Sequence, residues 1–192
     1  HCTLDMSVIV VVGMPGSGKE EFVNASASKG YTVVRMGDIV RDEAKNRNLQ
    51  TDDQSIGGFA ESERQQHGSL IWAERTLERV KGDKCVIDGT RSLDEVERFR
   101  QVFGQRLLLV AVFAPERTRF DRLSHRGRGD DPKNIDEFRK RDKRELGWGL
   151  GSAFASADLV IVNDATIDGF KEKAAKVLER LDNEAKSSPA QG

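Results

Sequence analysis

The sequence has few cysteines, no excess of charge of one sign and no long apolar run. Only two of the 192 residues are cysteines. Cys85 lies in an apolar segment typical of a core strand and Cys2 lies near the start of the chain, so no disulfide framework is predicted. The longest apolar runs, residues 8–12 and 107–114, fall far short of the ~20 residues that a membrane-spanning helix needs. These absences favour a protein of the reducing cytoplasm with no membrane partner.

Charge and aromatic content argue against a nucleic-acid-binding module. Lys and Arg together number 31 and Asp and Glu 32, so the net charge of −1 draws the chain to no polyanion. Aromatic residues are only 6% of the chain, too few for a platform on which bases stack. The His and Cys residues lack the spacing of a metal site, and no local motif suggests a Ser/His/Asp triad. Any anion binding must therefore be local, and no nucleic acid partner is expected.

Apolar, β-branched runs alternate with segments of helical period along the chain. The runs cover residues 7–12, 32–36, 84–87, 106–113 and 159–162 and are rich in Val, Ile and Leu, as strands buried on both faces require. This alternation predicts an α/β fold in which helices cover both faces of a five-stranded parallel sheet. The length fits one domain over residues 1–192.

The segment between the second and third expected strands is longer than a simple crossover helix of roughly 10–15 residues. A helical insert is therefore expected at 37–81, with pieces at 38–47, 56–66 and 69–81. A capping box of Ser92 and Glu95 predicts a helix to about residue 103, and Pro115, which suits a first turn, predicts one over 116–125. Further helices are expected over 134–145 and along the stripe from Phe170 to Leu181, before a flexible tail at 183–192.

The strongest motif follows the first expected strand and matches GxxxxGK. It runs through Gly13, Met14, Pro15, Gly16, Ser17, Gly18, Lys19 and Glu20. Between a strand and a helix, such glycines let successive backbone N–H groups surround phosphate oxygens, the helix presents its positive end, and the lysine reaches the β- and γ-phosphates. The motif predicts a P-loop NTPase, which is a three-layer sandwich, with ATP bound on this loop.

The residue after the lysine departs from the motif. Ser or Thr is usual there because its hydroxyl ligates Mg²⁺ between the β- and γ-phosphates, but this chain has Glu20. A carboxylate can ligate the metal directly or through water, or it can point away and leave the metal to other acids. Glu20, Asp38 and Asp88 are the candidate Mg²⁺ ligands.

Residues after the second and third expected strands extend the pattern. Gly37, Asp38 and Arg41 follow the second strand, and the run from Asp88 to Arg91 follows the third. With the P-loop, these residues resemble nucleoside monophosphate kinases and dephospho-CoA kinases, and most of all an archaeal family of adenylate-kinase-related P-loop proteins. The resemblance implies that Gly37 lets the acceptor approach the backbone, that Arg41 and Arg91 bind its phosphate, and that Asp88 is a Walker B acid. Asp38 is expected to orient magnesium waters or accept a proton, or else to cap the helix that follows it.

An arginine-rich stretch follows the fourth expected strand. Arg122 and Arg126 lie four residues apart, on one helix face. The resemblance implies a very short lid at 126–133, with Arg122 and Asn163 near the donor adenine. It also implies that Arg126, Arg128 and Arg139 neutralise charge on the transferred phosphoryl group, which guanidinium forks bind well. The other arginines of the stretch are expected to pair with neighbouring acids on solvated helix faces: Arg117, Arg119, Arg141 and Arg144.

These features favour an ATP- and Mg²⁺-dependent small-molecule kinase that transfers the γ-phosphoryl group to a nucleoside monophosphate. Lys19, Asp38, Asp88 and the lid arginines are the expected catalytic groups, and Arg64 in the insert is a further candidate contact to the acceptor. Two alternatives stay open. One is dephospho-CoA or another hydroxyl acceptor, for which Asp38 is an available base. The other is a nucleotide-binding switch or ATPase with little kinase activity. The acceptor, the oligomeric state and the role of Trp148 are left open by the sequence.

Overall fold

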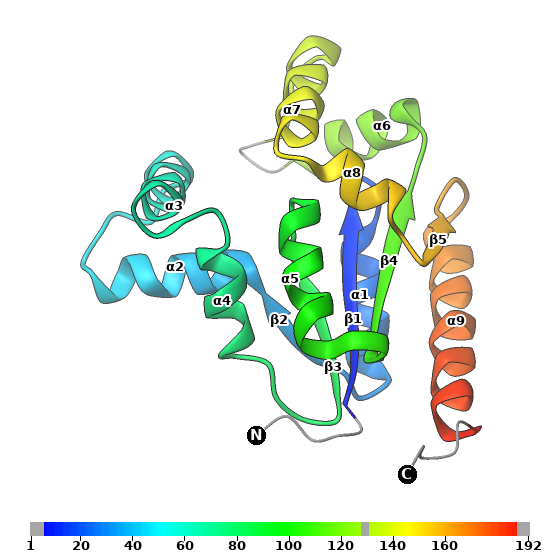
Figure 1. Ribbon diagram of the computed structural model, residues 1–192. Coiled ribbons are helices and arrows are strands. Elements are labelled where there is room, and N and C mark those ends of the chain that lie inside the picture. The colour runs from blue at the N-terminus through cyan, green and yellow to red at the C-terminus, as the bar shows by residue number, and fades with distance from the viewer. Residues whose placement is uncertain (1–5, 128–130, 188–192) are drawn as a thin grey trace.

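The computed structural model describes residues 6–127 and 131–187, and a five-stranded sheet forms its centre (Figure 1). The strands lie in the order β2-β3-β1-β4-β5, and each neighbouring pair is parallel. They are β1 (Ser7–Gly13), β2 (Thr32–Arg35), β3 (Lys84–Asp88), β4 (Leu107–Phe113) and β5 (Leu159–Val162). The α/β fold with a five-stranded parallel sheet, predicted from the alternating pattern, is confirmed.

Helices cover both faces of the sheet. They are α1 (Lys19–Ser28), α2 (Met36–Asn46), α3 (Asp53–His67), α4 (Ile71–Leu77), α5 (Leu93–Phe103), α6 (Glu116–Arg126), α7 (Ile135–Gly147), α8 (Leu150–Ala155) and α9 (Ile167–Ser187), with a 3₁₀ turn, η1 (Gly104–Arg106), before β4. Along β1, Val8 and Val10 face a core shared with α2, α4, α5 and α8, whereas Ile9 and Val11 face a second core formed with α1 and α9. Successive strand side chains point to opposite faces, so this central strand is apolar throughout.

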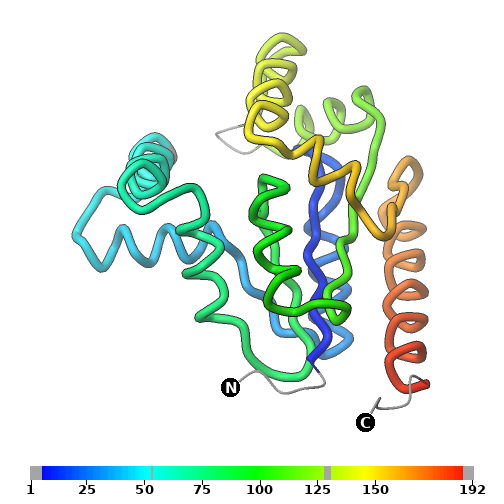
Figure 2. The backbone as a smooth tube through the Cα atoms, viewed as in Figure 1, coloured from blue at the N-terminus to red at the C-terminus, as the bar shows by residue number. Residues whose placement is uncertain are grey.

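Two groups of helices lie beyond the sheet itself. The path of the chain in Figure 2 shows α2, α3 and α4 extending from the edge formed by β2, and α6 and α7 standing over the ends of the central strands. The first group corresponds to the insert expected at 37–81. Both groups begin at the carboxyl ends of strands. Parallel α/β sheets bind their ligands at this edge.

The structure differs from the expected element boundaries at several points. Met36 was assigned to the second strand but begins α2, because a buried apolar side chain at a strand end looks the same in sequence whether strand or helix carries it. The helix expected at 69–81 is the shorter α4, which ends in a turn where Arg79 N–H donates to the Thr76 carbonyl. Helix α8 has only six residues, too few to show a helical period, and was not predicted.

Helix boundaries that depend on a capping side chain agree closely with the structure. Ser92 caps α5 and accepts from the backbone N–H of Glu95, and Pro115 precedes the first residue of α6. At the other end of the chain, α9 continues to Ser187. The prediction of a flexible tail from residue 183 is therefore wrong for residues 183–187. An ion pair joins Glu184 on this extension to Arg180, one helical turn earlier.

Membrane insertion finds no support in the helices. Among residues 6–127 and 131–187, none of them combines the length and the apolar character needed to cross a bilayer.

Candidate functional site

The P-loop joins β1 to α1 with a backbone that only glycine suits at two places. Gly16 and Gly18 have φ of 80° and 88°, the left-handed region that other residues rarely adopt. A methyl group on Gly18 would lie 2.1 Å from the Asn163 amide nitrogen, and one on Gly16 would lie 2.7 Å from the Arg119 carbonyl oxygen. Helix α1 begins at Lys19, so its N-terminal N–H groups follow the loop directly.

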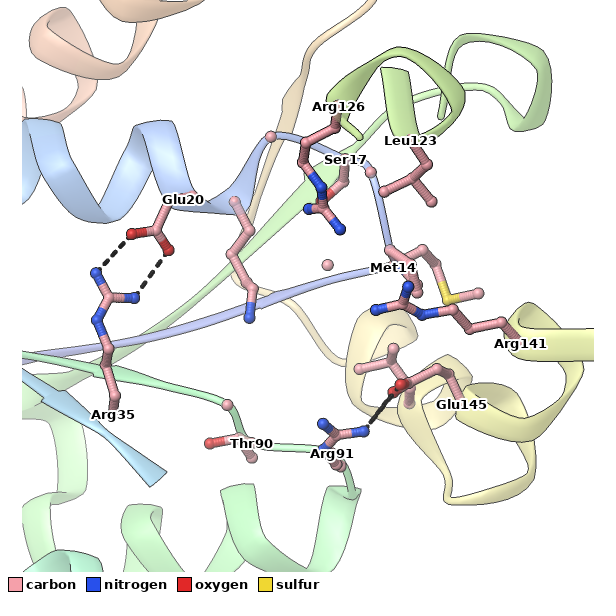
Figure 3. Close-up of a pocket in the computed structure, with 17 residues that line it drawn as sticks. Met14, Ser17, Glu20, Arg35, Thr90, Arg91, Leu123, Arg126, Arg141 and Glu145 are labelled. Carbon is pink, nitrogen blue, oxygen red and sulfur yellow. Dashed lines mark hydrogen bonds and ion pairs between the residues drawn. The ribbon is translucent and has the colours of Figure 1, made fainter. Parts of the chain in front are cut away.

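Four charged side chains form a chain of ion pairs at the base of this loop. Lys19 Nζ lies 2.5 Å from Asp88 Oδ1. Arg35 Nη1 donates to the other oxygen of Asp88 over 2.9 Å. Arg35 also donates to both carboxylate oxygens of Glu20, over 2.7 and 2.8 Å (Figure 3). The order is therefore Lys19, Asp88, Arg35, Glu20, and the charges sum to zero.

Arg35 was not predicted as a site residue. It is the last residue of β2 and is aligned with Asp88, the last residue of β3, in the parallel register of the two strands. A charged residue at the end of a buried strand was the available signal. Burial acts to lower the pKa of Arg35, but hydrogen bonds and charges from Glu20 and Asp88 outweigh it and raise the pKa above its ordinary value. The guanidinium therefore stays charged.

Lys19, Glu20 and Arg35 line a cavity of about 480 Å³. The P-loop forms one wall, Gly89 to Arg91 form another, and residues of α6, α7 and α8 complete it. Figure 3 shows Arg126 and Arg141 pointing into the space across from Thr90. Cations from five parts of the chain line the cavity: Lys19, Arg35, Arg91, Arg126 and Arg141. Glu20 and Glu145 are the acids among its lining residues.

Arg91 is held from two sides. Its Nη1 lies 2.9 Å from both carboxylate oxygens of Glu145, and its guanidinium carbon lies 4.6 Å from the ring centroid of Trp148. Glu145 lies in α7 and Trp148 is the C-cap of that helix, so α7 fixes the orientation of Arg91. The role of Trp148, which the sequence left open, includes this cation–π contact.

Two arginines of α6 bind the P-loop backbone. Arg122 donates to the carbonyl oxygens of Gly16 and Ser17 at 3.3 Å and to that of Asn163 at 2.8 Å. The Asn163 amide in turn donates to the Ser17 carbonyl at 2.8 Å. Burial lowers the pKa of Arg122. The structure thus brings Arg122 and Asn163, both predicted from the resemblance, to one place beside the loop.

Arg119 was expected on a solvated face, and that expectation is wrong. Its residue is only 7% exposed. It donates to the Pro15 carbonyl at 3.2 Å and forms two hydrogen bonds of 2.7 and 2.8 Å with Asp142 of α7. Eight arginines lie between residues 117 and 144, and their spacing alone did not single out this one. Arg141 was likewise expected on a solvated face but lines the cavity.

Several predicted residues lie away from the cavity. Asp38 and Arg41 pair with each other at 3.3 Å and are mostly exposed. Asp38 lies inside α2, whose N-cap is Arg35, so the alternative of a capping role is wrong. Gly37 lies beside Arg41, because a methyl group on it would come within 3.2 Å of that guanidinium. The predicted roles of these residues in acceptor binding and catalysis stay predictions.

Three other arginines complete the predicted set. Arg64 pairs with Glu61 at 3.6 Å on the same helix, and Arg139 pairs with Glu116 at 2.8 Å. Hydrogen bonding to Glu116 raises the pKa of Arg139. Neither arginine lines the cavity. Arg128 lies outside the described residues, and with it the centre of the lid expected at 126–133.

The loop fits the phosphates of a nucleotide better than the site fits a metal. Ser17 is 1% exposed, and its Oγ has no hydrogen-bond partner among the described residues. Its hydroxyl is therefore available to donate to a phosphate bound in the P-loop. In contrast, both oxygens of Glu20 accept from Arg35. Residues 6–127 and 131–187 contain no group of three or more His, Cys, Asp or Glu side chains placed to hold a metal ion. Asp88 forms ion pairs with both the P-loop lysine, Lys19, and Arg35.

Comparison with known proteins points to one group. A family described as an AAA domain matches residues 12–139. A UPF0200 protein of Thermoplasma acidophilum is 44% identical over 89% of this chain and 94% of its own length. A gluconokinase from Sinorhizobium meliloti has a similar structure, with a TM-score of 0.61 and 16% identity over 96% of this chain and 99% of that one. A shikimate kinase from Bacteroides thetaiotaomicron has a TM-score of 0.60 and 16% identity over 91% and 99%. At such identities the two structures show the fold, which is that of P-loop kinases.

Proposed function

This chain belongs to the UPF0200 proteins and carries an AAA domain with a P-loop kinase-like fold. From that premise we propose that it is an ATP- and Mg²⁺-dependent kinase of a small molecule. The proposed acceptor is a nucleoside monophosphate. The single observation that supports the proposal most is the convergence of cations from five parts of the chain on the cavity beside the P-loop. Its volume of about 480 Å³ lies within the range of small-molecule sites.

The donor side of the proposal rests on the P-loop. Backbone N–H groups from Gly16 to Lys19 surround the phosphates, and Lys19 exchanges its contact with Asp88 for a phosphate oxygen. Arg122 and Asn163 hold the loop in shape from the adenine side. When bound, ATP supplies the phosphoryl group and magnesium supplies positive charge beside it.

Transfer of a phosphoryl group requires little covalent chemistry from the protein and much neutralisation of charge. Arg126 and Arg141 point into the cavity from α6 and α7, where guanidinium groups can bind the transferring phosphoryl oxygens. Arg91, on the opposite side and oriented by Glu145 and Trp148, binds a phosphate of the acceptor in this proposal. The side-chain groups that the reaction needs thus come from different elements around one space.

A hydroxyl acceptor is the second candidate. Of the two arginines expected to bind an acceptor phosphate, Arg91 lines the cavity whereas Arg41 pairs with Asp38 outside it. Because only one of these two arginines lines the cavity, an acceptor that carries one acidic group and a reactive hydroxyl fits as well. Two structures with this fold are named as kinases of gluconate and shikimate, which adds such compounds to the candidates.

The experiment that tests the proposal is an acceptor panel. The protein is supplied with ATP and Mg²⁺ and, in separate reactions, with each common nucleoside monophosphate, dephospho-CoA, gluconate or shikimate, and both ADP and phosphorylated product are measured. Product with a nucleoside monophosphate supports the leading proposal, and product with a hydroxyl compound selects the second candidate. ADP that forms at the same rate with every acceptor and with none would contradict both and indicate a slow ATPase or switch. Lys19→Ala should abolish product formation in each case.

A further inference from the structure

Glu20 occupies the position where P-loops usually carry a metal-ligating hydroxyl, and its carboxylate has another partner. Arg35 binds it with two parallel hydrogen bonds of 2.7 and 2.8 Å (Figure 3). Two-pronged contacts between guanidinium and carboxylate are among the strongest hydrogen-bonded ion pairs. Both oxygens are used, so the carboxylate has no oxygen left that does not already accept from Arg35.

Arg35 does not move freely with Glu20, because it is held by a second carboxylate. Its Nη1 lies 2.9 Å from Asp88 Oδ2, and the Asp88 side chain is only 9% exposed. Strand pairing adds a backbone constraint, since Arg35 and Asp88 are opposite each other in the β2–β3 register. Moving Glu20 onto a metal would therefore leave Arg35 against Asp88 alone, where it competes with Lys19.

We propose that Glu20 and Arg35 form a charge clamp, in which Glu20 binds Arg35 in place of the metal and each side chain hides the charge of the other from the bound nucleotide. The metal then takes no ligand from the residue that follows the P-loop lysine. The inference rests on the proposed function only as far as ATP binding, and phosphoryl transfer does not enter it.

The clamp gives opposite effects for its two halves. Without Glu20, the Arg35 guanidinium lies exposed near the phosphates, so ATP should bind more tightly in the absence of metal. Without Arg35, an unpaired carboxylate faces the phosphates, so ATP should bind more weakly unless a divalent ion bridges the two. With both side chains removed the charges again balance, and the affinity should return close to that of the wild type.

The test measures the dissociation constant of a fluorescent ATP analogue in EDTA and over a series of Mg²⁺ concentrations. The variants are Glu20→Ala, Arg35→Gln and the double variant. Neither substitution introduces a side chain that could bind the metal in place of the Glu20 carboxylate. Metal-free affinity should rise about fivefold in Glu20→Ala and fall about fivefold in Arg35→Gln. The double variant should lie within about twofold of the wild type, with the same half-saturating Mg²⁺ concentration.

Glu21→Ala is the matched control. Glu21 is the next residue in the first turn of α1 and pairs with Lys171 at 3.9 Å. Its removal therefore changes the charge of the helix end and leaves the clamp intact. Its metal-free affinity should change less than that of Glu20→Ala. Circular dichroism verifies the fold, and since Glu20 is exposed, the Glu20→Ala variant alone decides the question if Arg35→Gln fails to fold.

The outcomes separate the clamp from a metal-binding Glu20. If Glu20 is a ligand, Glu20→Ala and the double variant will both need at least about tenfold more Mg²⁺ for half-saturation, and that result would overturn the clamp, as would metal-free affinities that do not move in opposite directions in the two single variants. ATP binding with the predicted pattern but no phosphoryl transfer would contradict only the kinase proposal. A wild-type protein that binds no ATP would contradict both.

Discussion

Gly18 of the P-loop lies against Asn163, which follows β5. Its φ of 88° is unfavourable for any other residue, and the Asn163 amide lies where a side chain would begin. Gly30 has nearly the same φ, 90°, but nothing lies within 4 Å of the place where its side chain would be. The two glycines separate the effect of backbone strain from that of crowding.

Substituting each by alanine should reveal this difference. Gly30→Ala is expected to lower the free energy of unfolding by roughly 1 kcal/mol, from strain in φ alone. Gly18→Ala is expected to cost more, because Asn163 must also move, and to weaken ATP binding. Urea unfolding and ATP titration of the two variants check this, and equal losses of stability with unchanged ATP affinity would contradict the contact.

At the scale of single residues, the sequence predicted the groups that belong to a motif and missed those that support it. Lys19 and Asp88 follow from the P-loop and the strand ends, and the structure pairs them. Arg35 and Arg119 were missed because their importance comes from partners 15 to 104 residues away in the chain. No local spacing records such pairs.

At the scale of elements, the insert is held together by a buried carboxylate. Glu63 of α3 is 2% exposed. It accepts from Arg47, which follows α2, at 2.7 and 3.1 Å and from Arg75 of α4 at 2.5 Å. The two guanidinium groups also lie over the rings of Phe59 and Trp72. One side chain therefore links three helices.

Glu63→Gln should lower the free energy of unfolding by roughly 2 kcal/mol, because Arg75 loses its negative partner while the more exposed Arg47 keeps only Glu43. Glu61→Gln on the same helix is the control: Glu61 is mostly exposed, and the loss should stay within about 0.5 kcal/mol. Chemical denaturation of the two variants and the wild type provides the comparison. Similar values for both variants would show that Glu63 does not link the helices energetically.

The same carboxylate predicts how stability depends on pH. Hydrogen bonds from Arg47, with those from Arg75, lower the pKa of Glu63 despite its burial. A lowered pKa in the folded state stabilises the protein above the unfolded value of about 4.3, and this contribution is lost as the pH falls through the folded pKa. The difference in stability between wild type and Glu63→Gln should therefore be constant above about pH 5 and shrink below about pH 4. A difference that persists in acid would contradict this.

Element positions could be predicted where the sequence has its own start and stop signals. The helices that begin after Ser92 and Pro115 start where these residues indicated. The start of α2 could not be found in this way, because no side chain caps it. Helix α8 was missed because its six residues are too few to show a helical period.

At the scale of the whole molecule, the site is assembled from elements spread over most of the chain. The P-loop follows β1, Arg91 follows β3, Arg126 and Arg141 come from α6 and α7, and Asn163 follows β5. A ligand that contacts all of these stabilises the folded chain as a unit.

ATP at about 100 times its dissociation constant should add about 2.7 kcal/mol to the free energy of unfolding, or roughly 5–10 °C in Tm for a chain of this size. Lys19→Ala should lose most of this increase. Lys29→Ala should retain it, because Lys29 lies at the other end of α1 and pairs with Glu179. Thermal unfolding with and without ATP measures the effect, and an equal shift in both variants would mean that the nucleotide binds elsewhere.

The central claim, that this cavity transfers a phosphoryl group between two bound molecules, is tested most directly by phosphorus NMR of one reaction mixture containing ATP, Mg²⁺ and the acceptor selected by the panel. The account predicts that ADP and phosphorylated acceptor appear in equal amounts, with no free phosphate formed at the same rate. Free phosphate that rises in step with ADP, whether or not the acceptor is present, would contradict it.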